Sequence, residues 1–358
     1  RAISGFGVWD SIPNLARGAA RLDPIYLLDS LPEEQGGEVS IPSLETAQYK
    51  SSNRSGPRAT VYDHTVNVYG KVSGLAAAQR PLDNVGVQYG LNALNNRAIT
   101  LQQFIDLNRD IGGFDRDMNH ISDRHRGDIQ AVRRAFESGR ILNGGAGLSK
   151  TPIIDYRTYL DHEEGGNIHM LIHQFSTRER LLSANGHADN HVMQVGGNWN
   201  FDTEAQKFGE LYKEMDRWLT AINSDTRDID SNVKVVENRP ESLSDACWDN
   251  TGEVSIKIIE SQTFNGSNRC NELYPMYSTP RHVAGAPLAN SIVRCVLRPI
   301  SPADYGVGFT PSQYAELNNI FPGGVCDWSQ GDDSEATLQG TWVSFGPSPI
   351  NLLYEIDN

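Results

Sequence analysis

Carboxylates and histidines gather in one stretch of the chain, between residues 151 and 191. The segment 151–161 begins with apolar and β-branched residues and ends in an acidic loop that carries Asp161. Five of the nine histidines follow within thirty residues, and these are His162, His169, His173, His187 and His191. General-base catalysis requires a neutral imidazole that a carboxylate orients. We therefore expect proton-transfer chemistry in this stretch.

Asp161 is the preferred acid. It stands nine residues after Pro152, where a strand is predicted to begin, and this separation suits an acid just past a strand end. Asp155 is the competitor, but it lies inside the strand, where an Asp is more often paired with a polar neighbour. For Asp161 the alternative role is that of a solvated loop carboxylate.

His169 is the preferred base because it opens the helix predicted after the acidic loop. His173 follows one turn later on the same helical face. The pair does not form the H-E-x-x-H pattern of zinc enzymes, so a zinc site is disfavoured. His187 and His191, which flank the next predicted strand, are the alternatives. Each of these histidines could also be an ordinary hydrogen-bonded side chain.

A nucleophile for these groups is missing. A serine elbow requires G-x-S-x-G, because small neighbours permit the strained strand-to-helix turn that exposes the hydroxyl, and the chain contains no such pentapeptide. The segments 70–74 and 147–151 come near to it but lack the spacing or the second glycine. The chain also begins at Arg1 without an apolar leader. We expect it to be the second half of a protein, with the serine on a separate or missing N-terminal chain.

A calcium loop is a weaker candidate for a cofactor site. Asp115, Asp117, Asn119 and Asp123 follow the D-x-D-x-N pattern with an acid at the ninth position. His120 replaces the turn glycine, and Arg126 stands where the bidentate Glu belongs. The alternative is a polar loop between helices. Apart from possible calcium, the sequence predicts no cofactor, since phosphate-binding and haem motifs are absent.

The cysteines predict a disulfide-stabilised region. The four residues Cys247, Cys270, Cys295 and Cys326 are 23, 25 and 31 positions apart, without the close pairs of a zinc knuckle. Two disulfides imply an oxidising compartment, so we expect a secreted or periplasmic protein. Three connectivities are possible, of which we favour Cys247–Cys270 with Cys295–Cys326. Four buried thiols are the alternative.

The elements that must position these residues predict an α/β fold. A strand near 152–161, a helix over 168–184, a strand over 191–195 and a strongly amphipathic helix over 203–222 follow one another. This βαβα order is typical of a parallel sheet with helices on its faces, and the strand after Pro152 is the best candidate for a buried one. Further strands are predicted at 256–259, 291–297 and 341–345.

The first 150 residues predict lid and connecting segments. Residues 32–60 are turn-rich, and the alternation over 60–69 predicts a half-buried strand. Short helices are predicted over 85–95, 101–111 and 128–138, and we interpret them as a helical lid. The domain prediction is therefore a lid region over 1–150, a βαβα core over 151–235 and a β and loop region over 236–358.

Composition excludes some classes of function. The chain has 358 residues, with 31 Lys and Arg against 45 Asp and Glu, which gives a formal charge of −14. A net acidic chain is a poor nucleic-acid binder, because neutralising phosphates requires clustered basic residues. No apolar run approaches the roughly 18 residues that a membrane span needs.

Four stretches carry a resemblance to a known family: 80–91, 111–117, 152–161 and 283–290. Over most of residues 1–345 the chain resembles the C-terminal half of a bacterial family of largely uncharacterised secreted proteins. That family is distantly similar to tannase, feruloyl esterase and hydroxybutyrate-oligomer hydrolases, which are α/β-hydrolases. The resemblance implies that Asp161 is the acid and His169 the likeliest base, with the serine elbow upstream of this chain. In the usual chain order the histidine follows the strand after the acid, and this makes His282 a further candidate.

The resemblance and the residues together predict the C-terminal part of a secreted serine acyl hydrolase. It would cleave an ester, or else an amide, through an acyl-enzyme, and its partner would be the chain or subunit that bears the nucleophile. The alternative is a non-catalytic secreted subunit that binds a partner, with its acids and histidines merely solvated.

Overall fold

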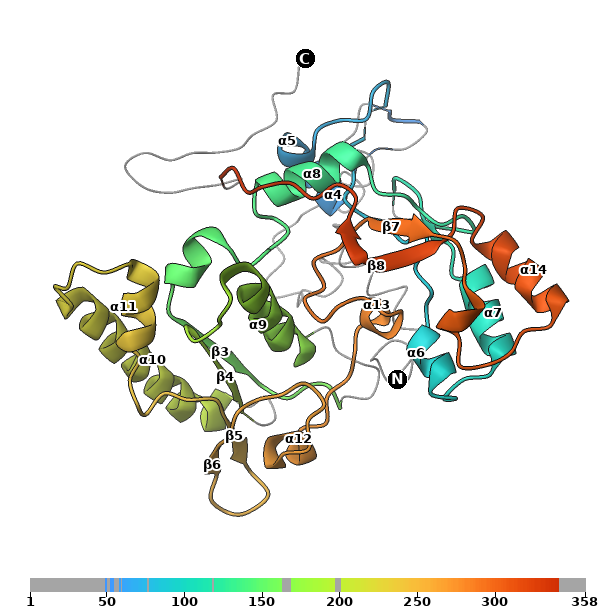
Figure 1. Cartoon of the computed structure of the whole chain (residues 1–358). Helices are drawn as coiled ribbons and strands as arrows, with labels where there is room; N and C mark the ends of the chain where they lie inside the picture. Colours follow the sequence, from blue (N-terminus) through green and yellow to red (C-terminus); the bar gives the residue numbers. More distant parts are fainter. Residues whose placement is uncertain are drawn as a thin grey trace. The chain divides into compact units, whose positions relative to one another are not determined.

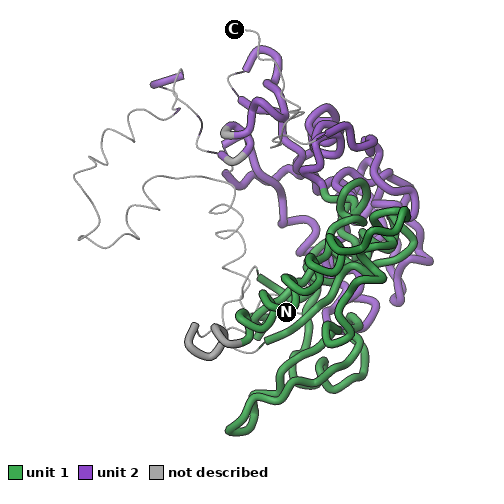
Figure 2. The backbone as a smooth tube through the Cα atoms, turned by 90° about the vertical axis from the view of Figure 1, so that its left-hand side faces the viewer, with its two compact units in different colours: residues 1–9, 142–291 green, residues 10–141, 292–358 purple. Residues whose placement is uncertain are grey.

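The chain divides into two compact units (Figure 2). Unit 1 contains residues 1–9 and 142–291, and unit 2 contains residues 10–141 and 292–358. The domain boundaries predicted at residues 150 and 235 stay predictions. A computed structural model describes residues 49, 52–54, 58, 60–75, 77–117, 119–162, 169–196 and 201–340.

A four-stranded sheet is the centre of unit 1 (Figure 1). Its strands are β3 (Ile153–Arg157), β4 (His191–Val195), β5 (Ala246–Asp249) and β6 (Ile256–Ile259), in the order β3-β4-β5-β6. Strands β3, β4 and β5 run parallel, and β6 pairs antiparallel with β5. The predicted α/β class with a parallel sheet is thus confirmed, and the predicted strands 191–195 and 256–259 form with the expected bounds.

Helices cover both faces of this sheet. Helix α9 (Ile172–Asn185) connects β3 to β4, while α10 (Phe201–Ser224) and α11 (Ser231–Glu237) connect β4 to β5. Successive side chains of a strand point to opposite faces. Asp155 therefore faces α9, whose Gln174 reaches it, and Val192 faces the other way and packs against Trp218 of α10. Asp155 and His191 consequently share the α9 face.

Among the strands that the structure describes, β4 is more buried than β3, so the prediction that the strand after Pro152 is the best buried strand is wrong. All five residues of β4 are buried, whereas all five of β3 are only half-buried. Among the described strands, β4 pairs on both sides and β3 on one side only. The number of neighbouring strands determines how deeply a strand is buried, and the apolar pattern within a single strand does not predict that number.

Within the described part of unit 2, residues 60–69 form two single-turn helices, α4 (Val61–His64) and α5 (Val66–Tyr69), so the strand predicted over 60–69 is wrong. The side chain of Thr60 accepts a hydrogen bond from the amide of Asp63 and caps α4. Asp63 in turn accepts a hydrogen bond from the amide of Ala78 at 2.7 Å. An N-cap supported by this contact outweighs the weak β preference of alternating Val and Tyr residues.

The helices predicted over 101–111 and 128–138 form in unit 2 as α7 (Leu101–Asp110) and α8 (Ile129–Glu137). Of the helix predicted over 85–95, only the second half forms, as α6 (Leu91–Asn95). A capping box between Thr100 and Gln103 starts α7, as the sequence indicates. A short hairpin of β1 (Gly113–Phe114) and β2 (His120–Ile121) separates α7 from α8. Whether these helices act as a lid stays a prediction.

The C-terminal part of unit 2 is an antiparallel pair, β7 (Cys295–Arg298) with β8 (Val325–Asp332). Strand β7 begins later than the predicted strand 291–297, and the predicted strand 341–345 lies outside the described residues. Helix α14 (Pro311–Ile320) and the turn η2 (Pro302–Asp304) lie between the two strands in the sequence. Leu94, Phe104, Leu317 and Val325 belong to one buried apolar cluster, which joins α6, α7, α14 and β8.

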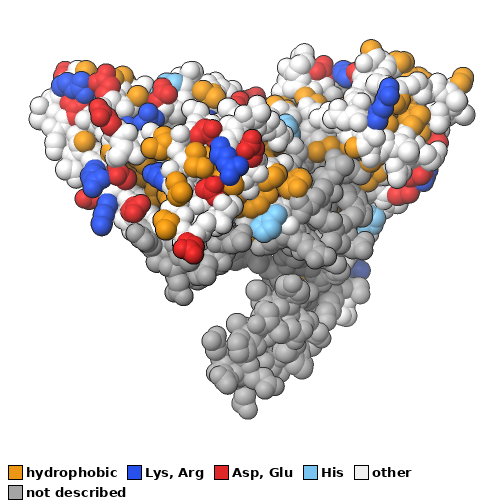
Figure 3. Space-filling model, turned by 90° about the horizontal axis from the view of Figure 1, so that it is seen from below, with side chains coloured by type: hydrophobic (Ala, Val, Ile, Leu, Met, Phe, Trp, Pro, Cys, Tyr) orange, Lys and Arg blue, Asp and Glu red, His pale blue; other side chains and the backbone are white. Residues whose placement is uncertain are grey.

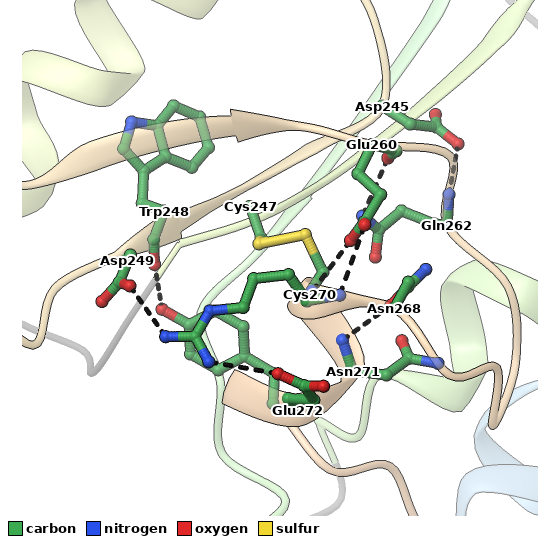
Figure 4. The surroundings of a disulfide bond; sticks show 12 residues. Asp245, Cys247, Trp248, Asp249, Glu260, Gln262, Asn268, Cys270, Asn271 and Glu272 are labelled. Atoms are coloured by element: carbon green, nitrogen blue, oxygen red, sulfur yellow. Dashed lines mark hydrogen bonds and ion pairs between the residues drawn. A yellow bond between two sulfur atoms is a disulfide. The ribbon is translucent and has the colours of Figure 1, made fainter.

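Both predicted disulfides are present with the favoured pairing. Cys247–Cys270 joins β5 to α12 (Arg269–Leu273), and Cys295–Cys326 joins β7 to β8. Each unit therefore contains one disulfide. Around the first disulfide, the carboxylate of Glu260 accepts a hydrogen bond from the backbone amide of Cys270 at 2.9 Å (Figure 4). The guanidinium of Arg269 donates hydrogen bonds to Asp249 and Glu272.

The described part of unit 1 also contains the 3₁₀ helix η1 (Ala146–Lys150) and the single-turn helix α13 (Pro280–Val283). No helix among the described residues is long and apolar enough to cross a membrane.

Candidate active site

The carboxylate of Asp161 links two segments of unit 1 at the carboxyl end of β3. Its side chain is buried, with 3 % of the residue exposed. Oδ1 accepts the backbone amide of Leu171 at 2.9 Å, and Oδ2 accepts the amide of Tyr277 at 3.3 Å. Leu171 immediately precedes α9, so the carboxylate lies at the positive end of that helix. Ligand sites in parallel sheets form at this edge, beyond the carboxyl ends of the strands.

Two predicted histidines belong to the segments around Asp161. His162 follows the acid directly, and its ring stacks on that of Tyr159 with the centroids 4.9 Å apart. The hydroxyl of buried Tyr159 donates to the carbonyl of Pro275 at 2.7 Å. His169 is exposed and stands two residues before Leu171, whose amide Asp161 binds. The carboxylate of Asp161 thus connects its own segment to the segment that carries His169.

The third segment carries His282, the remaining histidine candidate near Asp161. Tyr277, which donates to Asp161, is followed by Ser278, and the hydroxyl of Ser278 lies 3.0 Å from Nδ1 of His282. The ring of Phe264 meets the imidazole edge to face at 5.4 Å. Burial lowers the pKa of His282 below its ordinary value, which favours the neutral base at physiological pH.

Tyr277 and Ser278 were not among the residues that the sequence indicated for this site. Their role depends on the fold bringing residue 277 to residue 161. The only local indication in the sequence is the four-residue spacing between Ser278 and His282, which is compatible with a side-chain contact.

The other histidine candidates lie at the opposite edge of the sheet. His191 pairs with Ile153 at the beginning of β3, so about 13 Å of strand separates it from the end at Arg157. The side chain of His191 has 0 % exposure. His187 precedes β4, and its Nδ1 lies 3.8 Å from Asp189. The structure therefore places His169 and His282 on the two segments whose backbone amides bind Asp161, and it leaves His187 and His191 at the amino ends of the strands.

Asp155 belongs to a buried polar network with His191. Its Oδ2 lies 3.5 Å from Nε2 of His191, and its Oδ1 lies 3.4 Å from Nε of Arg157. Burial by itself would raise the pKa of Asp155. The hydrogen bond with His191 and the charge of Arg157 outweigh burial, so that the pKa is lowered. These contacts match the paired role that the sequence analysis considered for an in-strand Asp.

Arg178 of α9 extends this network. Its guanidinium binds both carboxylate oxygens of Asp245, at 2.6 and 2.8 Å, and its Nε donates to Nδ1 of His191 at 3.3 Å. Nδ1 of His191 is therefore an acceptor, and its proton lies on Nε2, toward Asp155. The three side chains of Arg178, His191 and Asp245 line part of a polar cavity of about 490 Å³ at the amino ends of the parallel strands.

Three of the predicted calcium ligands, Asp115, Asp117 and Asn119, lie between β1 and β2 in unit 2, and Asp123 follows β2. Oδ1 of Asp115 accepts the backbone amides of Asp117 and Asn119, at 2.8 and 2.9 Å, and Asp117 forms an ion pair with Arg58. Asp123 is exposed. Within the described ranges, no group of three or more His, Cys, Asp or Glu side chains has the arrangement of a metal site. Calcium binding stays an untested prediction.

The arrangement around Asp161 can hold and move a proton. A buried carboxylate fixes the segments that carry His169 and His282, and a neutral imidazole beside such a centre can deprotonate a hydroxyl nucleophile. Cys247–Cys270 and Asp161 both fix residues of the 269–277 segment. The geometry thus defines an α/β unit in which a buried carboxylate beyond the end of β3 fixes two histidine-bearing segments.

The chain belongs to a tannase-like family of unknown function, DUF6351, which it matches over residues 1–337. No curated protein and no solved structure is significantly similar to it. The family membership confirms the resemblance to an uncharacterised tannase-like family that the sequence carries.

Proposed function

We propose that the protein is part of an acyl hydrolase that cleaves esters through a serine acyl-enzyme. Asp161 is the acid and His169 the base predicted from the sequence, while His282 is the alternative base. The observation that carries the proposal is the buried carboxylate of Asp161, which holds two histidine-bearing segments at the carboxyl edge of the parallel strands. Membership of a tannase-like family supports ester hydrolysis as the chemistry.

In this reaction the neutral imidazole takes the proton of the serine hydroxyl while its oxygen attacks the ester carbonyl. The resulting imidazolium gives that proton to the leaving alcohol, and the acyl-enzyme remains. Water then attacks the acyl carbon with the same imidazole as base, which releases the acid and restores the serine. The carboxylate of Asp161 keeps the histidine segments in place and stabilises the positive charge that forms during both steps.

The serine and the oxyanion hole are proposed to come from a separate or upstream polypeptide that carries G-x-S-x-G. The absence of this pattern from the 358 residues supports such a composite site. The fold then corresponds to the later part of an α/β-hydrolase sheet, with the helices before residue 150 as a lid. Two disulfides support a secreted or periplasmic location, in which proteolytic processing would produce two associated chains.

Labelling with a fluorophosphonate tests this assignment. The protein is purified from its native source with any polypeptide that accompanies it, labelled, digested and analysed by mass spectrometry. The expected result is one labelled peptide that contains a G-x-S-x-G serine from outside this chain. In parallel, His169→Ala is expected to lower hydrolysis of an activated ester by about 10²- to 10⁴-fold if His169 is the base.

A second set of outcomes would contradict the proposal. A pure 39.6 kDa polypeptide that neither reacts with the fluorophosphonate nor hydrolyses esters would identify a non-catalytic binding subunit. Labelling at a serine inside this chain would keep the hydrolase and reject the composite site.

A further inference from the structure

The imidazole of His282 is held on two sides. Ser278 lies 3.0 Å from Nδ1 through its hydroxyl, and the ring of Phe264 meets the imidazole edge to face. Phe264 also packs against Phe175 of α9, with the ring centroids 5.5 Å apart. Both the hydrogen-bonding nitrogen and the ring plane are therefore fixed by unit 1 itself, as catalytic geometry requires.

The backbone around His282 is anchored as well. The side chain of Thr279 accepts the amide of His282 at 3.2 Å and caps α13, and the amide of Tyr277 donates to Asp161. Ser278 lies between these two anchors. The position of its hydroxyl is thus set by the same carboxylate that binds the segment before α9.

The hydrogen bond between Ser278 and His282 can exist with either group as donor. If the hydroxyl accepts from Nδ1–H, the bond survives when the imidazole takes up a second proton, because Nδ1 keeps its hydrogen. If the hydroxyl donates to Nδ1, protonation of that nitrogen breaks the bond. The first arrangement alone leaves Nε2 with the lone pair and lets the ring cycle between neutral and charged forms without rearranging.

We propose that Ser278 is a positioning residue that accepts the Nδ1 proton of His282 and thereby makes Nε2 of His282 the general base of the site around Asp161. This inference rests on the proposed function, and it chooses His282 over His169. Ser278 then does for Nδ1 what a carboxylate does in most serine hydrolases, since it fixes the tautomer and the orientation of the ring. Asp161 acts one step further away, by holding the backbone of the Ser278 segment.

The tautomer of His282 is the first test, and it needs no activity. Nitrogen NMR of the full chain labelled with ¹⁵N-histidine distinguishes a protonated Nδ1 from a protonated Nε2. The native chain is expected to show Nδ1–H at His282, and Ser278→Ala is expected to shift it toward the Nε2–H form. Ser278→Thr keeps a hydroxyl and should retain Nδ1–H. Thr279→Ala removes the helix cap but leaves this bond, so it is the structural control.

Hydrolysis of an activated ester by the native assembly is the second test. His282→Gln is expected to lower the rate by about 10²- to 10⁴-fold. Ser278→Ala should lower it by a smaller factor, with rescue by Ser278→Thr, whereas Thr279→Ala should change the Tm more than the rate.

The outcomes separate the two proposals. An Nε2–H tautomer in the native chain, or full activity of His282→Gln, overturns this inference and leaves the acyl hydrolase in place. A native assembly without ester hydrolysis overturns both.

Discussion

Unit 1 contains two groups of polar residues, one at each end of the parallel strands. Asp161 binds two backbone amides at the carboxyl edge, while Arg178 joins His191 to Asp245 at the amino edge. A paired guanidinium and carboxylate that are mostly buried indicate a structural role, because removing one partner leaves the other charge uncompensated. The carboxylate of Asp161 instead accepts hydrogen bonds from two backbone amides, and it thereby fixes the two segments that carry His169 and His282.

The Arg178–Asp245 pair predicts a pH-dependent stability. Burial would raise the pKa of Asp245, but the hydrogen bonds from Arg178 outweigh it, and the pKa is lowered. The pair therefore stabilises the fold above the ordinary pKa of Asp, and this stabilisation is lost as pH falls through the lowered value. Asp245→Asn is expected to reduce the free energy of unfolding by about 3 kcal/mol at pH 7. The difference from the native protein should shrink in acid.

Urea unfolding at several pH values measures this effect. Asp106→Asn is the control, since Asp106 pairs with Arg109 on the surface of α7 and such pairs contribute little. Equal stabilities of Asp245→Asn and the native chain at pH 7 would show that the buried pair has no net effect.

At the level of residues, the sequence predicts that Asp161 lies just beyond a strand and that Asp155 is paired, and the structure shows both placements. The role of Asp161 as the acid stays a prediction. Ser278 could not be predicted, because its significance depends on Tyr277 reaching Asp161, more than 100 positions away. Such long-range contacts are determined by the tertiary fold, and local sequence spacing does not predict them.

Elements with strong local signals formed where the sequence placed them. The apolar spacing of α10 and the capping box of α7 predicted these helices, and β4 begins and ends as expected. The alternation of apolar and polar residues over 60–69 predicted a strand, but the segment is helical. The Thr60 cap and the contact of Asp63 with the amide of Ala78 stabilise the helical conformation. Within α10, Tyr212 and Leu219 are exposed while Trp218 is buried, so the apolar stripe is narrower than its sequence pattern.

Substitution of Gly324, in the turn before β8, is expected to destabilise the fold. Gly324 has a φ of +98°, and a Cβ there would lie 2.3 Å from the carbonyl oxygen of Arg298 in β7. Gly324→Ala is expected to lower the free energy of unfolding by more than about 1 kcal/mol, because the side chain meets both backbone strain and a clash. Gly308→Ala is the matched control, since nothing lies within 4 Å of its added Cβ. Similar melting temperatures for the two variants would contradict this interpretation.

The whole molecule combines a formal net charge of −14 with one disulfide in each unit. On the face drawn in Figure 3, acidic and basic side chains of the described residues are interspersed with apolar ones. The assembly of unit 2 from residues 10–141 and 292–358 depends on contacts such as the amide of Cys326 with the carbonyl of Gly86. Joining segments this distant is a global property, whereas the βαβα order of unit 1 is local and could be predicted.

Removal of either disulfide should destabilise the protein. Cys247 and Cys270 are 23 residues apart, and closing a loop of this size stabilises the fold by about 3 kcal/mol. The double variant Cys247→Ser with Cys270→Ser is expected to lower the Tm, and so is the corresponding change of Cys295 and Cys326. Calorimetry with and without reductant measures both effects. An unchanged Tm under full reduction would show that the bridges contribute nothing to stability.

Ester hydrolysis by the native assembly with Asp161→Asn tests the central claim most directly. The asparagine keeps the size of the side chain but loses the charge that supports the histidine segments. The rate is expected to fall by orders of magnitude, while Asp216→Asn, an exposed change on α10, leaves it unaltered. A properly folded Asp161→Asn assembly that hydrolyses esters at the native rate would contradict the account.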